Sequence, residues 1–270
     1  MGQIENGVHD LTNEQYHRSS GVSRSSLMKL KQSPMHYQFD RNKIEPNEST
    51  PAMVMGELIH TKVLEPGEYD KRYYVTTPCD KRTKAGKEDW LNQQKLAEGK
   101  TIISLEQAMI STQISESVAS DLLAHTLLED CVMEKSIYFT HEPTGLQCKV
   151  RPDAWNGVIV VDLKTTVDAS FRGFQGSAAK YGYFLQAGMI HQALKSIGIA
   201  MERFIFIAVE KEPPYAVGIF VLDGEALDYG VNQFNQLMQK LDKCTNENAW
   251  PSYGIQNLTL PGWTKYEEIE

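Results

Sequence analysis

Three segments with the hydrophobic pattern of β-strands occupy the middle of the chain. We predict strands over Val132–His141, Leu146–Trp155 and Val158–Thr165, arranged as a meander. The dipeptide Asn156-Gly157, between the second and third segments, is typical of a tight hairpin turn. The run Val158–Val161 is continuously apolar, which predicts a strand covered on both faces.

Helical patterns dominate the N-terminal third. Ser23 or Ser25 can cap a helix that runs through Leu30 and ends before Pro34. A short strand is predicted over Tyr73–Thr77. Further helices are predicted over Pro34–Arg41, Pro51–Leu64, Thr83–Glu98 and Leu105–Leu128.

After the meander the pattern alternates between helix and strand. We predict a helix over Lys180–Ser196, strands over Arg203–Glu210 and Ala216–Leu222, and a last helix over Glu225–Cys244. This order indicates an α/β (α+β) fold with a central mixed β-sheet flanked by helices. Because no linker rich in Pro, Gly or Ser divides the chain, we expect a single domain over residues 1–270. Residues 1–130 would be mainly helical, 131–245 would form the sheet core, and 246–270 a C-terminal tail.

Composition narrows the class of protein. The chain has 270 residues, of which 41% are hydrophobic, and no apolar run is long enough to span a bilayer. Its N-terminus lacks the apolar core of a signal peptide, and its four cysteines show no CxxC spacing. We therefore expect a cytoplasmic protein that binds neither zinc nor a membrane.

Charge alone does not indicate a nucleic-acid partner, since the net charge is −8. A basic groove can nevertheless coexist with an acidic exterior. Basic residues cluster locally, although their ordinary interpretation is solvated surface. These residues are Lys29, Lys31, Lys81, Arg82, Lys84, Lys87, Lys149 and Arg151.

Candidate catalytic residues lie close together at the end of the predicted hairpin. Asp162 and Lys164 are two residues apart on one strand and therefore point to the same face. Asp153, on the partner strand, can face Asp162 across the pair. Two carboxylates beside an ammonium group suit a divalent cation that activates water for attack on a phosphodiester.

Three further side chains are candidates, and two of them have two interpretations each. His60 ends an apolar helix and is either a core residue or a ligand of the cation. Gln186 is either an exposed helix residue or a group aimed at the attacking water or a substrate phosphate. Glu134 could be an acid behind the metal ligands. Walker, GxSxG and HExxH motifs are absent from the sequence, which disfavours a nucleotide-driven motor and a zinc hydrolase.

The assembled motifs resemble those of the PD-(D/E)XK nuclease superfamily, and more closely the nuclease domain of the exonuclease VIII (RecE) family. The resemblance extends across nearly the whole chain. Its motifs, in order, are GVSRSSLMKLKQSPMHY (21–37), MGELIHTKVLEP (55–66), EKSIYF (134–139), CKVRPD (148–153), VVDLKTT (160–166), YFLQ (183–186), and then WPSY and LPGW.

This resemblance implies a PD-(D/E)XK core and an active site. It implies that the catalytic residues are His60, Asp153, Asp162, Lys164 and Gln186. The cation, Mg²⁺ with Mn²⁺ as a substitute, would be held by His60, Asp153, Asp162 and the backbone carbonyl of Leu163. Lys164 would orient or activate the attacking water.

The resemblance also implies a substrate and an assembly. The expected activity is 5′→3′ degradation of linear double-stranded DNA, which leaves 3′ overhangs for recombination by single-strand annealing. A ring-shaped homotetramer and an annealing partner of the RecT type are implied as well. Candidate DNA contacts are Tyr183, Tyr181, Arg24, Lys81, Arg82, Lys84 and Lys87. A structure-specific or restriction-type endonuclease and a non-catalytic DNA-binding recombination accessory protein remain the alternatives.

Overall fold

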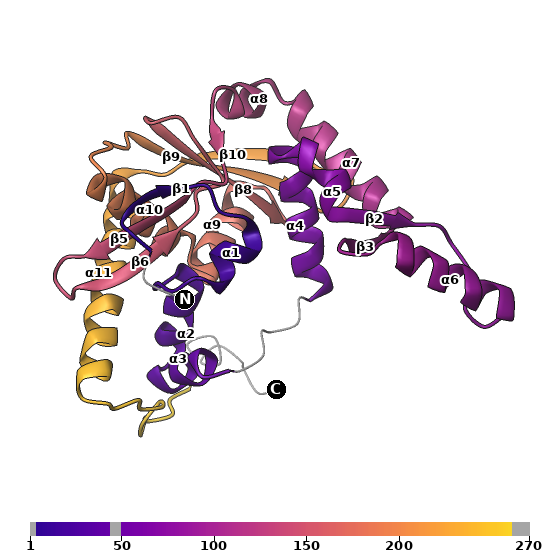
Figure 1. Ribbon diagram of the computed structural model, residues 1–270. Coiled ribbons are helices and arrows are strands. Elements are labelled where there is room, and N and C mark those ends of the chain that lie inside the picture. The colour runs from indigo at the N-terminus through magenta and orange to yellow at the C-terminus, as the bar shows by residue number, and fades with distance from the viewer. Residues whose placement is uncertain (1–3, 44–49, 261–270) are drawn as a thin grey trace, which may run out of the picture.

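A five-stranded mixed sheet forms the centre of the protein (Figure 1). The structure is a computed structural model that describes residues 4–43 and 50–260. Strands β8 and β9 run parallel, and the other neighbours pair antiparallel, which confirms the predicted mixed sheet. The strand order is β10 (Val217–Val221), β9 (Arg203–Glu210), β8 (Ile159–Thr166), β7 (Ala154–Trp155) and β4 (Val132–Met133).

The predicted meander is divided between two sheets. A separate three-stranded sheet consists of β1 (Gly7–His9), β5 (Ser136–His141) and β6 (Leu146–Val150). The two predicted strands Val132–His141 and Leu146–Trp155 are therefore each broken, which corrects the expectation. Glu134 interrupts the first with a positive φ of 52°. Pro152 interrupts the second, because it has no N–H to donate to a neighbouring strand.

The hairpin turn before β8 lies one residue later than its sequence suggested. Trp155 pairs with Val160, and the Asn156 N–H donates to the Ile159 carbonyl at 3.2 Å, so that Gly157 and Val158 form the tip. Gly157 has a φ of +90°, which favours glycine.

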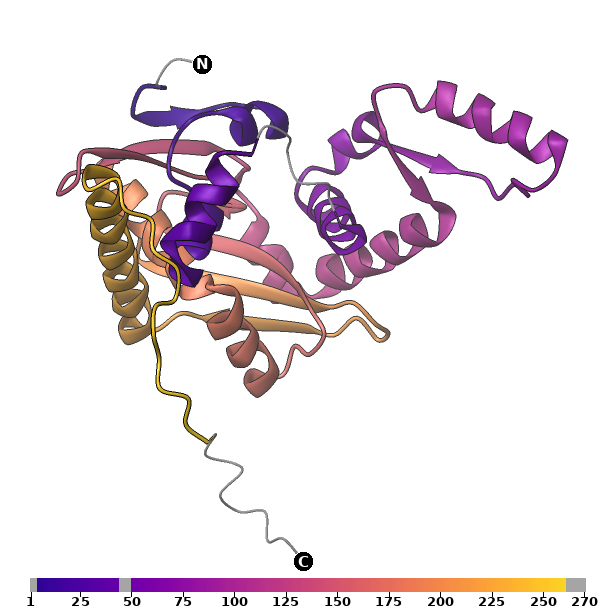
Figure 2. The ribbon, with the colours of Figure 1, turned by 90° about the horizontal axis from the view of Figure 1, so that it is seen from below.

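Helices cover both faces of the sheet (Figure 2). On one face, α2 (Arg24–Gln32), α9 (Phe171–Tyr181), α10 (Tyr183–Ser196) and α11 (Gly224–Asn246) pack around the main hydrophobic cluster. On the other face lie α4 (Pro51–Leu64), α7 (Leu105–Ser120) and α8 (Leu122–Leu128). Val160 and Val161 are 1% and 0% exposed and belong to the two different clusters, so this part of the apolar run is covered on both faces as predicted, whereas Val158 at its start is 47% exposed.

Capping residues explain where the helices begin and end. Ser23 caps α2 and Pro34 begins α3 (Pro34–Arg41), as predicted. The predicted helix 105–128 is broken because the Asp121 side chain accepts from the Ala124 N–H at 2.8 Å and starts α8. Helix α9 and the short helix α1 (Asn13–Arg18) were not predicted. Gly182, with a φ of +72°, separates α9 from α10, so α10 begins three residues later than expected.

An extension projects from the side of α4 and α7 (Figures 1 and 2). The chain enters it through η1 (Pro66–Glu68) and α5 (Tyr69–Arg72). It consists of β2 (Tyr73–Thr76), α6 (Lys84–Leu96) and β3 (Thr101–Ser104), with β2 and β3 paired in parallel. We call residues 73–104 the arm. Among the described residues, no helix combines the length and the apolar character needed to cross a membrane.

Candidate active site

Strand β8 delivers Asp162 and Lys164 to the face of the sheet that α10 covers. Asp162 is completely buried and its Oδ2 forms an ion pair with Lys164 Nζ. Its other oxygen, Oδ1, accepts from Gln186 Nε2 on α10 at 2.6 Å. The alternation of side chains along a strand thus brings these two groups to one place, and α10 adds the third.

Asp153 lies beside Asp162 on the neighbouring strand, as the hairpin predicts. Since Ala154 pairs with Val161, the preceding residue comes opposite Asp162. The Asp153 Oδ2 accepts from the Leu163 N–H at 2.8 Å, which fixes the carboxylate. Asp153 is 8% exposed.

His60 and Glu134 join Asp153 from two other elements. His60, near the end of α4, places Nδ1 3.6 Å from Asp153 Oδ2. One ligand atom from each of His60, Glu134 and Asp153 lies within 4.8 Å of the others. Burial, and then the Asp153 carboxylate, raise the pKa of Glu134 to about 8, although Arg151 opposes this rise. We call these three residues the ligand group.

The ligand group fits a divalent cation. Two carboxylates and an imidazole are suitable donors for Mg²⁺ or Mn²⁺. Positive charge between Glu134 and Asp153 would also remove the repulsion that raises the pKa of Glu134. The group contains His60 and Asp153 of the expected set and adds Glu134, while Asp162 contacts Lys164 and Gln186. The expected roles of Asp162 and of the Leu163 carbonyl as ligands stay predictions.

The Asp162–Lys164 pair is shielded from water. Burial, and then repulsion by Asp153, raise the pKa of Asp162 to about 6, while Lys164 opposes the rise. Burial acts to lower the pKa of Lys164, but Asp162 and Asp153 raise it above the ordinary value of a lysine. Lys164 therefore stays protonated at neutral pH. Its Nζ also lies 5.1 Å from the centre of the Tyr183 ring.

A cavity of about 380 Å³ adjoins Glu134 and Gln186. It is lined mainly by α1, the start of α2, strand β6 and α10, and three of its side chains, Arg24, Lys149 and Arg151, are cationic. The polar lining residues are Asn13, Tyr16, His17, Ser23, Arg24, Ser25, Glu134, Lys149, Arg151 and Gln186.

Two cations that line this cavity hold the N-terminal segment in place through hydrogen bonds to backbone carbonyls. Lys149 Nζ donates to the carbonyls of Tyr16 and Ser19, each at 2.7 Å. Arg151 Nη2 donates to the Leu11 carbonyl at 2.7 Å. Lys149 is only 6% exposed, so its interpretation as solvated surface is wrong. Sequence reasoning missed this role because the partners lie more than 100 residues away along the chain.

The predicted DNA contacts fall into two places. Arg24 and Tyr181 lie near the site, since Arg24 Nη1 donates to the Tyr181 carbonyl at 2.7 Å and the Tyr181 and Tyr183 rings are 6.1 Å apart. Tyr181 ends α9, whereas Tyr183 begins α10. The remaining four lie on the arm: Lys81, Arg82, Lys84 and Lys87.

Residues 23–258 match the model of a protein family described as "PDDEXK-like domain of unknown function (DUF3799)". The chain belongs to this family. The match contains Asp153, Asp162 and Lys164, and the α/β fold agrees with a PD-(D/E)XK core, as the resemblance predicted. No curated protein matches the chain.

One solved structure supports the fold. A protein from Eubacterium rectale, described as a "putative exonuclease", superposes with a TM-score of 0.66 at 13% identity. The superposition covers 97% of this chain and 100% of that one. A second structure, SSO0001, has 13% identity over 78% of this chain and 85% of its own, but its TM-score of 0.27 is too low to indicate a shared fold.

Proposed function

We propose that this protein is a metal-dependent deoxyribonuclease that degrades linear duplex DNA from its 5′ ends and leaves 3′ overhangs. One observation carries the proposal. The ligand group lies directly beside the buried Asp162–Lys164 pair, on a fold of the PD-(D/E)XK type. Hydrolysis of a phosphodiester needs both a cation site and a fixed positive group at the developing charge.

The side chains divide this chemistry between them. A bound Mg²⁺ or Mn²⁺ supplies Lewis-acid charge neutralisation and makes water more acidic. Lys164 presents an ammonium group held by Asp162, where it can donate to negative charge that develops on the phosphate. Gln186 keeps the Asp162 carboxylate in position.

Attack at a DNA end is supported by the cavity beside the ligand group. Arg24 contributes positive charge there, and the His17 ring and the hydroxyl groups of Ser23 and Ser25 can donate hydrogen bonds. Such a lining suits the phosphate of a strand terminus. The exonuclease description of the E. rectale protein agrees with an end-dependent activity.

A plasmid assay tests the proposal. Purified protein is incubated with linear and covalently closed circular plasmid, with and without Mg²⁺, beside an Asp162→Asn control. We expect Mg²⁺-dependent loss of the linear form only, with 3′ single strands as intermediates and a faster start from 5′-phosphate than from 5′-hydroxyl ends. Cutting of the circle would support an endonuclease instead. Duplex binding without cleavage would support a non-catalytic accessory protein.

The finer expectations from the resemblance to exonuclease VIII stay predictions. They are the RecT-type annealing partner, the homotetrameric ring, the single-domain organisation and the cytoplasmic location. Residues 261–263 of the LPGW motif lie outside the described residues. Light scattering coupled to size exclusion would measure the mass of the assembly directly.

A further inference from the structure

The outer end of the arm is an exposed basic surface. Residues 81–87 contain four cationic side chains and no acid, in a chain whose net charge is −8. All four are exposed. We call Lys81, Arg82, Lys84 and Lys87 the basic tip. In both ribbon views the start of α6 is the part of the arm farthest from the sheet (Figures 1 and 2).

Among the described residues, one of the four cations of the basic tip forms an ion pair, and the acids Glu88 and Asp89 follow Lys87 directly in α6. Arg82 pairs with Asp80 at 3.0 Å, while Lys81 Nζ lies 3.2 Å from the centre of the Trp90 ring. In the described part of the chain, the side chains of Lys84 and Lys87 have no ion-pair or hydrogen-bond partner. Both lysines occupy the first turn of α6, where the helix dipole disfavours positive charge and no acid is present. Residues that oppose a local rule in this way commonly serve function.

The turn that presents the basic tip is tightly built. Thr83 Oγ1 donates to the Asp80 carbonyl at 3.0 Å and accepts from the Gly86 N–H at 3.0 Å. A Cβ at Gly86 would lie only 2.0 Å from the Asp80 carbonyl oxygen, so this position requires glycine. Near the other end of α6, the Gln93 side chain accepts a hydrogen bond from the Thr77 N–H and donates one to the Thr77 carbonyl. The cations therefore extend from a fixed frame.

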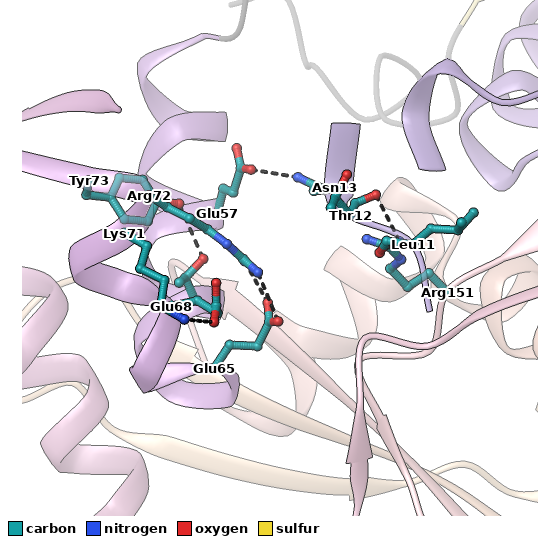
Figure 3. A network of polar contacts seen from close by, with 11 residues as sticks. Leu11, Thr12, Asn13, Glu57, Glu65, Glu68, Lys71, Arg72, Tyr73 and Arg151 are labelled. Carbon is teal, nitrogen blue, oxygen red and sulfur yellow. Dashed lines mark hydrogen bonds and ion pairs between the residues drawn. The ribbon is translucent and has the colours of Figure 1, made fainter. Parts of the chain in front are cut away.

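The root of the arm is attached to the helix that carries His60. Leu58 of α4 is fully buried against Tyr69, Tyr73 and Ile103. Arg72, just before β2, binds Glu65 through two hydrogen bonds of 2.6 and 2.9 Å (Figure 3). The arm is thus held in a defined position relative to the ligand group.

We propose that the basic tip binds the phosphate backbone of duplex DNA beyond the site of cleavage. This inference rests on the proposed function, because it takes the same duplex as the ligand. Helix α6 alone is about 20 Å long, and 20 Å corresponds to about six base pairs of duplex. The tip therefore contacts phosphates on the order of six base pairs or more from the reacting bond. Since these contacts are to phosphates, they increase affinity without base specificity.

The test compares Lys84→Gln/Lys87→Gln with a matched pair, Lys240→Gln/Lys243→Gln. The control lysines are also three residues apart and exposed, but lie on α11. Binding is measured in Ca²⁺, so that the result does not depend on turnover. The probes are a 40-bp duplex and a 4-bp stem closed by a hairpin loop, which is too short to reach the tip. For the long duplex we expect the tip variant to bind about 10- to 60-fold more weakly at 0.1 M salt, with a salt slope reduced by about 1.8.

Binding of the short stem, and its hydrolysis in Mg²⁺, should equal those of the control. Equal affinities of the tip variant and the control variant for the long duplex would overturn the inference, and would leave an acidic protein surface as the candidate partner. Equal losses on both probes would also overturn it, because the lysines would then act on the site or the fold. If the wild type binds duplex through the tip but hydrolyses none in Mg²⁺, the proposed function fails and this inference stands.

Discussion

The glycine contact between α10 and α11 offers a sharp test of how packing supports the site. A Cβ at Gly188 of α10 would lie 2.3 Å from the carbonyl carbon of Gly230, on α11. Ordinary contact needs at least 3.4 Å, so Gly188→Ala must separate the helices by about 1 Å. The obstacle is backbone, which cannot rotate away as a flexible side chain does.

Two opposing free energies set the expected stability change. Overpacking of this kind costs about 3 kcal/mol at the upper end of its usual range. Replacement of glycine by alanine within a helix returns about 1 kcal/mol. We therefore expect the free energy of unfolding to fall by about 2 kcal/mol. For a chain of this size that lowers the melting temperature by roughly 5 °C.

Gly176→Ala is the matched control. Gly176 lies within α9, is exposed, and its added Cβ meets no heavy atom within 4 Å. The control should gain up to about 1 kcal/mol from helix propensity alone. Urea titration of both variants measures the difference. A Gly188→Ala variant as stable as the wild type would refute the packing argument.

Gly188→Ala should also lower the activity of the site. Gln186 is two residues before Gly188 and holds Asp162 through a 2.6 Å hydrogen bond. A shift of about 1 Å can lower the rate about a hundredfold. We expect single-turnover hydrolysis by Gly188→Ala to fall by more than tenfold at a temperature where the variant stays folded. An unchanged rate would show that Gln186 does not position Asp162.

Three further outcomes are expected. Asp162→Asn should lose hydrolysis by at least about a hundredfold while duplex binding in Ca²⁺ persists; residual activity within a few fold of wild type would contradict its role. Glu134→Gln should lower Mn²⁺ affinity in calorimetry. Lys164→Met should abolish turnover and retain Mn²⁺ affinity, because an ammonium group is not a ligand. Retained Mn²⁺ affinity in Glu134→Gln together with lost affinity in Lys164→Met would contradict both roles. Burial, and then Arg151, lower the pKa of Lys149 to about 8. The unfolded chain therefore binds more protons between about pH 8 and 10.5. The free energy of unfolding of the wild type, relative to that of Lys149→Met, should rise with pH in that window. A difference that does not change with pH would contradict the lowered pKa of Lys149.

The patterns of strands, hairpins and helix caps were sufficient to predict contacts between residues that are close in the chain. Asp162 and Lys164 share a face because strand side chains alternate, and the hairpin carries Asp153 beside them. The caps at Ser23 and Pro34 were predictable for the same reason, since a cap acts on the turn that follows it. The roles proposed for these residues at the site stay predictions.

Other elements were missed because their stability comes from distant contacts. Helix α9 contains Gly173 and Gly176, which weaken its helical propensity, yet Phe174 is 3% exposed and packs against Phe220 at 4.5 Å between ring centres. The short helix α1 depends on Arg151 and Lys149, far away in the chain. Packing of this kind leaves no periodic pattern in the local sequence.

Glu134 shows why the composition of the ligand group was the hardest part to anticipate. The residue lies inside a segment whose pattern favours a continuous strand, and an unbroken strand would hold it in regular pairing. Instead its φ of 52° breaks the strand, while its N–H donates to the Asp153 carbonyl at 3.0 Å. A left-handed conformation costs a non-glycine residue on the order of 1 kcal/mol. Glycine would remove this strain but also the carboxylate, so the observed residue is explained if the side chain is needed beside Asp153.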